Sequence, residues 1–237
     1  IEAQTAIGAP TAANPALGLR AVRLCLRDTE MFKTQLRAIL RTSAHGPVRC
    51  LIPMLTSVHE VRMVRALIDE VRGELDQRFI PHDKAMPLGG MIEVPAAALS
   101  ASDLARHLDF LSVGTNDLLQ YALAADRVDE QVAHLYDPQH PGIIQLMKIV
   151  VEAAKKRQVP LAVCGELAGD RRYVRLLLAL GIREFSMHAN RLLEVKQIVT
   201  QTHVERAALV LEQWQEGHAD AYDLDLLEMI ESSQQAH

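Results

Sequence analysis

Acidic, amide and thiol side chains follow three short apolar runs of the sequence, each near the point where the run ends. Glu93 lies near the end of MIEV, Asn116 and Asp117 follow FLSVG, and Cys164 closes LAVC. If these runs are parallel strands, their carboxyl ends share one edge of a sheet and these side chains gather there. Mg²⁺ prefers oxygen ligands and usually takes one or two carboxylates plus substrate oxygens. Glu93 and Asp117 therefore predict a magnesium site, with two ordinary surface carboxylates as the alternative.

Arg127 and Cys164 each have a functional and a structural interpretation. Arg127 follows a predicted helix over 118–125, from where its planar guanidinium could reach a phosphate or carboxylate. On spacing alone, the better interpretation is an arginine stabilised by the dipole at a helix carboxyl end. Cys164 could be a thiol that donates a proton or attacks as a nucleophile, whereas lone cysteines are usually buried hydrophobes.

The composition excludes several functional classes. The 237 residues are 49% hydrophobic and 23% charged, which is typical of a globular chain. With 25 basic and 30 acidic side chains and 4% aromatic residues, the chain lacks the features of a nucleic-acid binder. Its apolar runs are too short for membrane insertion. Three cysteines and no secretory signal predict a cytoplasmic protein, and the histidine spacing predicts no zinc site.

Strands and helices are predicted to alternate along the chain. Short apolar runs predict five strands, over residues 48–55, 88–94, 109–114, 161–165 and 183–187. They are too continuous for half-exposed strands, so we expect strands buried on both faces. Helical periodicity predicts helices over 29–43, 57–79, 96–107, 141–157 and 170–180, with two or three more between 191 and 233. Ser57 and Glu60 have the spacing of a capping box.

This alternation indicates an α/β protein with a parallel sheet, either open and doubly wound or a (β/α)8 barrel. An open doubly wound sheet usually carries a glycine-rich phosphate loop after its first strand, and the sequence has neither G-x-G-x-x-G nor G-x-x-x-x-G-K. In a barrel, polar residues gather at the carboxyl ends of several strands. The sequence has that pattern, so a barrel is favoured.

Four motifs in this order and spacing carry a family resemblance: NPALGLRAVR (14–23), MIEVPAA (91–97), GTNDLLQYALAADR (114–127) and CGELAGD (164–170). Together they resemble the phosphoenolpyruvate (PEP)-binding domain of the enzyme I family, the PEP–protein phosphotransferases of the bacterial phosphotransferase system. The resemblance runs from about residue 14 to 200 and more weakly into the tail. It implies a TIM barrel of the PEP/pyruvate type.

The resemblance also implies roles for individual residues. Glu93 and Asp117 match the two Mg²⁺ ligands of the family, and Asn116 matches a residue that contacts the PEP phosphate. Arg127 matches an arginine on the phosphoryl group, and Arg20 matches another arginine of the ligand site. Such groups neutralise the compact PEP anion and stabilise charge during phosphoryl transfer.

Cys164 matches the cysteine that protonates the pyruvate enolate at its methylene carbon, a general-acid step typically worth about 10²–10⁴ in rate. For both Cys164 and Arg127, the resemblance therefore favours the functional interpretation over the structural one.

The sequence also departs from the family pattern. A motif resembling R-T-x-D-I-G-G-D-K, with a further arginine, precedes the first of these motifs in the family, and residues 1–13 carry no arginine. We therefore expect residues 1–13 to be a non-family extension or linker, and 14–237 to be an incomplete barrel of about five strands plus carboxyl-terminal helices. Its two open edges should be covered by a partner copy, by the tail helices or by a further segment.

The resemblance implies partners and leaves alternatives open. The parent enzyme would pass the phosphoryl group to a histidine on an amino-terminal domain and then to the small HPr carrier protein, releasing pyruvate, and would form a homodimer. This chain alone is expected to be inactive, because the acceptor histidine is missing. The alternatives are a PEP synthase, a pyruvate phosphate dikinase or a Mg²⁺-dependent pyruvate-enolate lyase on the same barrel, and a dimerisation module without catalysis.

Overall fold

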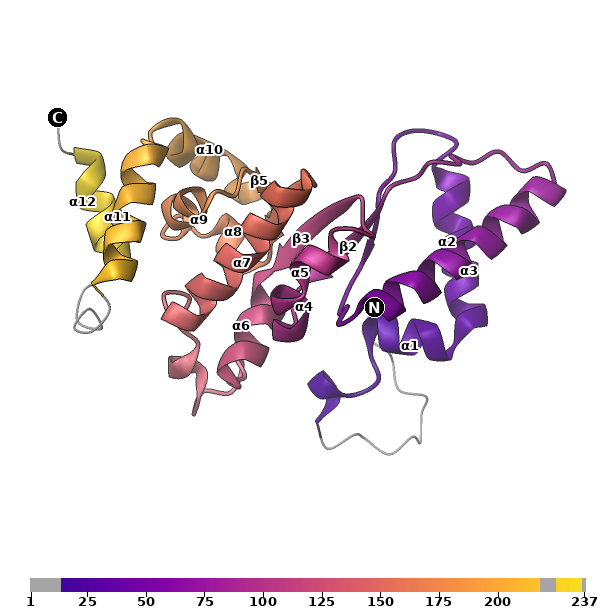
Figure 1. Ribbon diagram of the computed structural model, residues 1–237, viewed down its shortest axis with the longest axis horizontal. Helices are drawn as coiled ribbons and strands as arrows, with labels where there is room; N and C mark the ends of the chain where they lie inside the picture. Colours follow the sequence, from indigo (N-terminus) through magenta and orange to yellow (C-terminus); the bar gives the residue numbers. More distant parts are fainter. Residues whose placement is uncertain (1–13, 218–224, 236–237) are drawn as a thin grey trace.

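The computed structural model describes residues 14–217 and 225–235. The predicted extension over 1–13 lies outside the described residues. Five parallel strands pair in chain order: β1 Cys50–Ile52, β2 Leu88–Ile92, β3 Phe110–Gly114, β4 Leu161–Cys164 and β5 Glu184–Phe185 (Figure 1). The predicted α/β class with five parallel strands is confirmed. Each strand is shorter than predicted, and β1 and β5 form the two edges of the sheet.

The predicted helices are present but two of them differ in extent, and the structure adds short helices over 21–27 and 166–169 that the periodicity did not predict. Their bounds are α1 Ala21–Arg27, α2 Thr29–Thr42, α3 Val58–Gln77, α4 Pro95–Leu99, α5 Ala101–Leu104, α6 Thr115–Leu123, α7 Pro141–Arg157, α8 Glu166–Gly169, α9 Val174–Leu180, α10 Leu192–Thr200, α11 Val204–Glu216 and α12 Leu226–Gln235. The helix predicted over 96–107 is two short helices separated at Ser100, whose hydroxyl bonds back to the carbonyl of Ala96. The helix predicted over 170–180 is shorter than expected, because α9 begins only at Val174.

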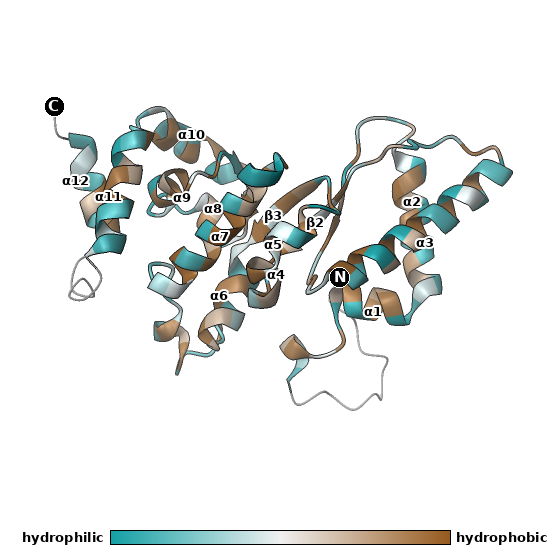
Figure 2. Ribbon diagram, viewed as in Figure 1, coloured by the Kyte–Doolittle hydropathy of each residue, from teal (hydrophilic) through white to brown (hydrophobic). Residues whose placement is uncertain are grey.

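The capping box predicted for α3 is present. The Ser57 hydroxyl accepts from the Glu60 N–H, and the Glu60 carboxylate accepts from the Ser57 N–H. Behind this cap, α3 buries the predicted apolar stripe, which includes Val61, Val64 and Ile68. Figure 2 shows the result in colour, with β3 hydrophobic and α3 alternating between hydrophobic and hydrophilic residues.

The two faces of the sheet differ in burial. On one face, residues such as Ile92, Val113 and Val163 are fully buried and share one core with the buried residues of α3, α7 and α9. The other face, here called the open face, carries one buried side chain, Ser112, and several that are only half-buried: Leu51, Met91, Phe110, Ala162 and Cys164. The prediction that the strands are buried on both faces is therefore wrong for the open face. The sequence run is apolar on both faces, but only one face has helices packed on it.

The tail helices pack away from the sheet. Helices α11 and α12 pack against each other and against α9, and α10 also contacts α9. In Figure 1, α9 to α12 lie at one end of the molecule and α1 to α3 at the other. Among the described helices, none is both long and apolar enough to cross a membrane.

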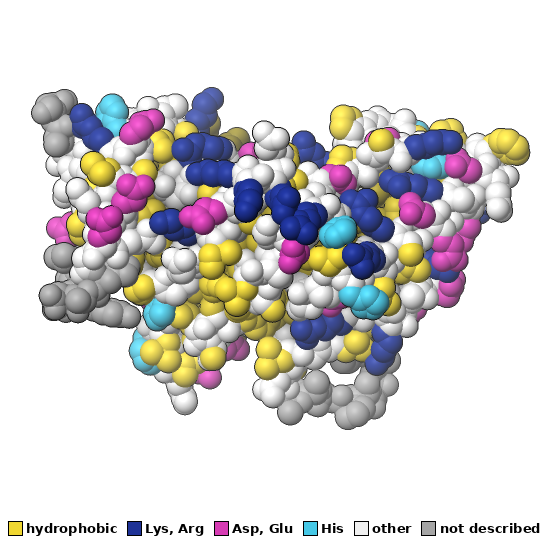
Figure 3. All heavy atoms as spheres, viewed as in Figure 1, with side chains coloured by type: hydrophobic (Ala, Val, Ile, Leu, Met, Phe, Trp, Pro, Cys, Tyr) yellow, Lys and Arg dark blue, Asp and Glu magenta, His cyan; other side chains and the backbone are white. Residues whose placement is uncertain are grey.

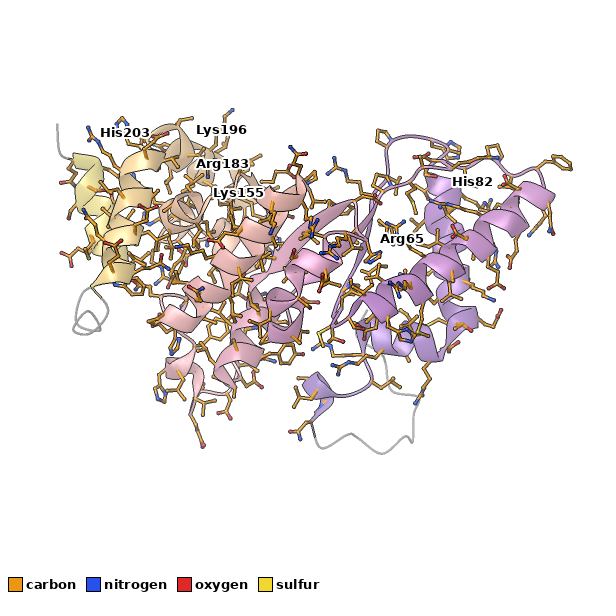
Figure 4. All side chains as sticks on the ribbon, in the orientation of Figure 1. Arg65, His82, Lys155, Arg183, Lys196 and His203 are labelled. Atoms are coloured by element: carbon orange, nitrogen blue, oxygen red, sulfur yellow. The ribbon has the colours of Figure 1, made fainter. Side chains whose placement is uncertain are left out.

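Basic side chains anchor the amino-terminal edge of the sheet. Arg65 on α3 donates to the carbonyl of His107, just before β3, and Arg183 donates to the carbonyls of Leu178 and Ile182, just before β5 (Figure 4). Figure 3 shows many Lys and Arg side chains across this view of the molecule. These bonds satisfy carbonyls just before the strands, so this edge stabilises the fold, whereas the carboxyl-terminal edge carries the candidate site residues.

Candidate functional site

Glu93 is a buried carboxylate directly after β2. Its residue is only 4% exposed, and its Oε1 accepts the backbone N–H of Met54 at 2.7 Å. Met54 holds a left-handed backbone conformation with φ of 59°, which is costly for a non-glycine residue and directs its N–H at the carboxylate. At the end of β3, a Cβ on Gly114 would lie 2.7 Å from Glu93 Oε2. Glycine at position 114 therefore leaves room for the carboxylate.

Asp117 adds a second carboxylate to the same edge. It lies in the first turn of α6, where the helix dipole favours negative charge. The pKa of Glu93 is raised to about 7, mainly by burial and also by the negative charge of Asp117, while the Met54 N–H bond and the charge of Arg20 oppose the rise. The nearest recorded cation is Arg20, whose Nη2 lies 3.8 Å from Asp117 Oδ2. Two neighbouring carboxylates fit a divalent cation, because a cation would offset their repulsion.

Arg20 is held at the site by the hydroxyl of Tyr121, which itself bonds to the chain before α1. Its Nη1 donates to the Tyr121 hydroxyl at 3.3 Å, and that hydroxyl donates to the carbonyl of Ala16 at 2.7 Å. Tyr121 comes from α6, about one turn after the first-turn Asp117 in the same helix. These hydrogen bonds connect the segment around Arg20 to helix α6, which carries Asp117. They place the Arg20 guanidinium beside the carboxylate pair.

Asn116 and Arg127 are joined through Glu166. The Asn116 Oδ1 accepts the Glu166 N–H at 2.9 Å, so its amide NH₂ is left to donate elsewhere. Arg127 Nη1 donates to Glu166 Oε1 at 2.5 Å, in a pair that is partly exposed. Tyr136 supports the arrangement by donating to the carbonyl of Asn116 at 3.1 Å. Sequence reasoning missed Glu166 and Tyr136, although Glu166 lies inside the CGELAGD motif.

Cys164 lies at the carboxyl end of β4, on the open face. Its Sγ is 3.5 Å from the Ser112 hydroxyl oxygen and 3.5 Å from the carbonyl oxygen of Val113. Burial raises the pKa of the Cys164 thiol, the Ser112 hydrogen bond opposes this, and the charge of Glu93 raises it again. At neutral pH the group is therefore a protonated thiol, which suits a proton donor better than a nucleophile.

An open cavity of about 880 Å³ extends from this edge past β5. Asn116, Cys164 and Glu166 line one side of it, and His188 and Arg191, from the segment after β5, line another. Sequence reasoning did not find this second side, because nothing in the pattern marks those residues. Glu93 and Asp117 are absent from the lining described for this cavity, so the carboxylate pair lies beside it rather than within it.

The structure thus brings together five of the six predicted site residues at one edge and links the sixth to them. Glu93, Asp117 and Arg20 form one group, and Asn116 and Cys164 form the adjoining wall of the cavity. Arg127 joins through Glu166. Among the described residues, no group of three or more His, Cys, Asp or Glu side chains could hold a metal by itself. A cation at Glu93 and Asp117 would therefore take its other ligands from water or from a bound substrate.

Comparisons with known proteins agree on one family. Residues 4–204 match the family described as PEP-utilising enzyme, PEP-binding domain. The chain is 52% identical over 203 residues to the phosphoenolpyruvate-protein phosphotransferase of Cupriavidus necator, covering 86% of this chain and 35% of that protein. For the proteins of the same name from Listeria monocytogenes and Bacillus subtilis, the identities are 44% over 190 residues and 40% over 198 residues. They cover 80% and 84% of this chain, and 33% and 35% of those proteins.

The chain therefore spans about a third of the length of these curated relatives. Among solved structures, a citrate lyase from Burkholderia xenovorans LB400 matches with a TM-score of 0.55 at 19% identity, covering 86% of this chain and 70% of that one. At this identity the likeness concerns the fold alone.

Glu93→Gln should stabilise the metal-free protein at high pH and not at low pH. Because folding raises the pKa of Glu93 from 4.5 to about 7, its contribution to stability is complete below pH 4.5 and is lost as the pH rises through 7. A neutral amide avoids that loss, so we expect a gain of roughly 3 kcal/mol at pH 8. Urea unfolding in EDTA at pH 4.5 and pH 8 measures it. The exposed Glu152→Gln on α7 is the control, and equal pH profiles for both variants would contradict the account.

Gly165→Ala should destabilise the protein and displace Asn116. Gly165 has φ of +93°, and a Cβ there would lie 2.4 Å from Thr115 Oγ1 and 2.8 Å from Asn116 Oδ1. We expect a loss of about 1–3 kcal/mol in the free energy of unfolding. The control is Gly73→Ala in α3, where a Cβ meets nothing within 4 Å, and which should stabilise by about 1 kcal/mol. Similar unfolding midpoints for the two variants would be the opposing result.

Proposed function

The chain belongs to the family of PEP-utilising enzymes, through their PEP-binding domain, and from that premise we propose that it binds PEP at the carboxyl edge of its sheet, as the PEP-binding domain of a phosphoenolpyruvate-protein phosphotransferase. The proposed domain covers residues 14–237. The observation that carries the proposal is the buried Glu93 carboxylate beside Asp117, with Arg20 at 3.8 Å from Asp117. Burial beside Asp117 disfavours the ionised form of Glu93, and a bound cation would offset that cost.

We propose that Glu93 and Asp117 hold Mg²⁺. The metal, when bound, supplies positive charge that neutralises the PEP phosphate and the leaving oxygen. The residues present fit this role, because both are carboxylates and Glu93 is oriented by the Met54 N–H. With only these two protein ligands, the geometry leaves coordination positions for substrate oxygens.

The remaining polar groups would bind the anionic ends of PEP. Arg20 lies beside the carboxylate pair, and the Asn116 amide has its NH₂ available for a phosphate oxygen. Arg127 is paired with Glu166 in the ligand-free protein, so binding would require it to exchange this carboxylate for the phosphoryl group. The exchange costs little free energy, because the Arg127–Glu166 pair is partly exposed and such pairs contribute about 0–1 kcal/mol to stability.

Cys164 would complete the reaction. Loss of the phosphoryl group leaves the enolate of pyruvate, whose methylene carbon must take up a proton. The thiol breaks its S–H bond, the enolate electron pair forms the new C–H bond, and the enolate oxygen becomes the pyruvate carbonyl. The raised pKa of Cys164 keeps the proton available at neutral pH until the enolate forms.

The other partners in the proposal follow from the family. The phosphoryl group would pass to a histidine on another domain of the parent enzyme and from there to an HPr-like carrier, in the cytoplasm. The open face and the two edge strands would be covered by the rest of the parent enzyme or by a second copy in a homodimer. We expect the chain alone to bind PEP without transferring its phosphate.

Calorimetric titration of PEP into this chain tests the proposal. We expect binding in Mg²⁺, none in EDTA, and at least about tenfold weaker binding for Asp117→Asn because one metal ligand is lost. The control is Asp69→Asn on α3, an exposed aspartate remote from the site. Equal binding in Mg²⁺ and EDTA, or equal effects of the two substitutions, would contradict the metal role. No binding by a folded sample would contradict a PEP site formed by this chain alone.

A further inference from the structure

Ser112 is a buried hydroxyl on the open face whose recorded partner is the Cys164 sulfur. It lies in the middle of β3, its residue is 5% exposed, and its Oγ is 3.5 Å from Cys164 Sγ. The strand register pairs Ser112 with Ala162 and Gly114 with Cys164. Because side chains alternate along a strand, Ser112 and Cys164 share one face and meet diagonally.

This hydroxyl is unusual for its surroundings. On its own face of the sheet, Ser112 is paired across the strands with Met91 and Ala162, whose side chains carry no oxygen or nitrogen to bond it. A buried hydroxyl costs free energy unless it is hydrogen-bonded, and a thiol sulfur is a weak acceptor. A serine retained only for stability would be better bonded to a backbone carbonyl, as the buried Ser43 is to the carbonyl of Leu40 at 2.6 Å. The Ser112 contact therefore points to a role at the thiol.

We propose that Ser112 is a positioning residue for Cys164, whose hydroxyl holds the sulfur in place while the thiol proton leaves. In the resting protein the thiol is within 3.5 Å of the Val113 carbonyl, which accepts the S–H. To protonate a ligand, the S–H must turn away from that carbonyl toward the carboxyl edge. The Ser112 O–H keeps the sulfur from moving with it.

The second effect of Ser112 follows from charge. When the S–H bond breaks, its electron pair stays on sulfur, and the thiolate then accepts a charge-assisted bond from the Ser112 O–H, which is stronger than the neutral one. The proton acceptor is the enolate carbon of the proposed function, on which this part of the inference rests. Solvent in the adjoining cavity returns the proton to sulfur.

Other charged groups also face the thiol. Glu93 at the end of β2 opposes thiolate formation. The cavity that Cys164 lines also carries the Asp170–Arg172 pair after β4.

Glu166 and Arg171 line the same cavity from the segment after β4, and His188, Arg191 and Glu194 line it from the segment after β5. Substitution of Ser112 leaves all these groups in place, so its effect on the thiol can be measured separately from theirs.

The test is the pH profile of Cys164 alkylation by iodoacetamide in this chain, read peptide by peptide by mass spectrometry. Loss of a hydrogen bond to a charged group should raise the thiol midpoint by about 1 pH unit in Ser112→Ala, and so slow alkylation at pH 8 roughly tenfold. Ser112→Thr keeps the hydroxyl and should restore the midpoint. Cys25 in the same molecule should keep its own profile.

Ser43→Ala is the matched control, because it removes a buried hydroxyl remote from the thiol. It should lower the melting temperature and leave the Cys164 midpoint unchanged. An unchanged midpoint in Ser112→Ala, the same shift in Ser43→Ala, or a rate change at all pH values without a midpoint shift would overturn the proposal. The calorimetric titration fails or succeeds independently, so loss of the PEP proposal and loss of the Ser112 proposal are distinguishable.

Discussion

The rest of the site depends on one unfavourable interaction, the burial of the Glu93 carboxylate next to Asp117. Removing a carboxylate from water is costly, and a second negative charge increases that cost. The protein offsets it with a backbone N–H from Met54 and a guanidinium from Arg20, and burial still holds the pKa of Glu93 near 7. A site that is under-neutralised when empty gains most from a cation and from the ligand that accompanies it.

Local backbone devices make this arrangement possible. Gly114 leaves space beside Glu93, and Gly165, in a left-handed conformation, lets β4 turn closely past Asn116. Parallel strands bring their carboxyl ends to one edge, so residues far apart in sequence meet there. At the opposite edge, Arg65 and Arg183 donate hydrogen bonds to backbone carbonyls. These bonds stabilise the fold and take no part in the site.

Much of this could be predicted from the sequence, and the exceptions have physical reasons. Continuous apolar runs and the Ser57–Glu60 spacing predicted the strands and the start of α3, because they depend on local periodicity and capping. The half-buried open face could not be predicted, since an apolar run does not reveal which face lacks a covering layer. The pairing of Ser112 with Cys164 also depends on strand register, which the sequence pattern leaves open.

Functional roles for Arg127 and Cys164 are proposed from the family resemblance, because their spacing alone favoured the structural interpretations. The central claim, that Glu93 and Asp117 form a divalent-cation site that serves PEP, is tested most directly by anomalous diffraction from crystals soaked with Mn²⁺ and PEP. The account predicts one anomalous peak between the two carboxylates, lost in Asp117→Asn. A peak at other residues, or an unchanged peak in the variant, would contradict it.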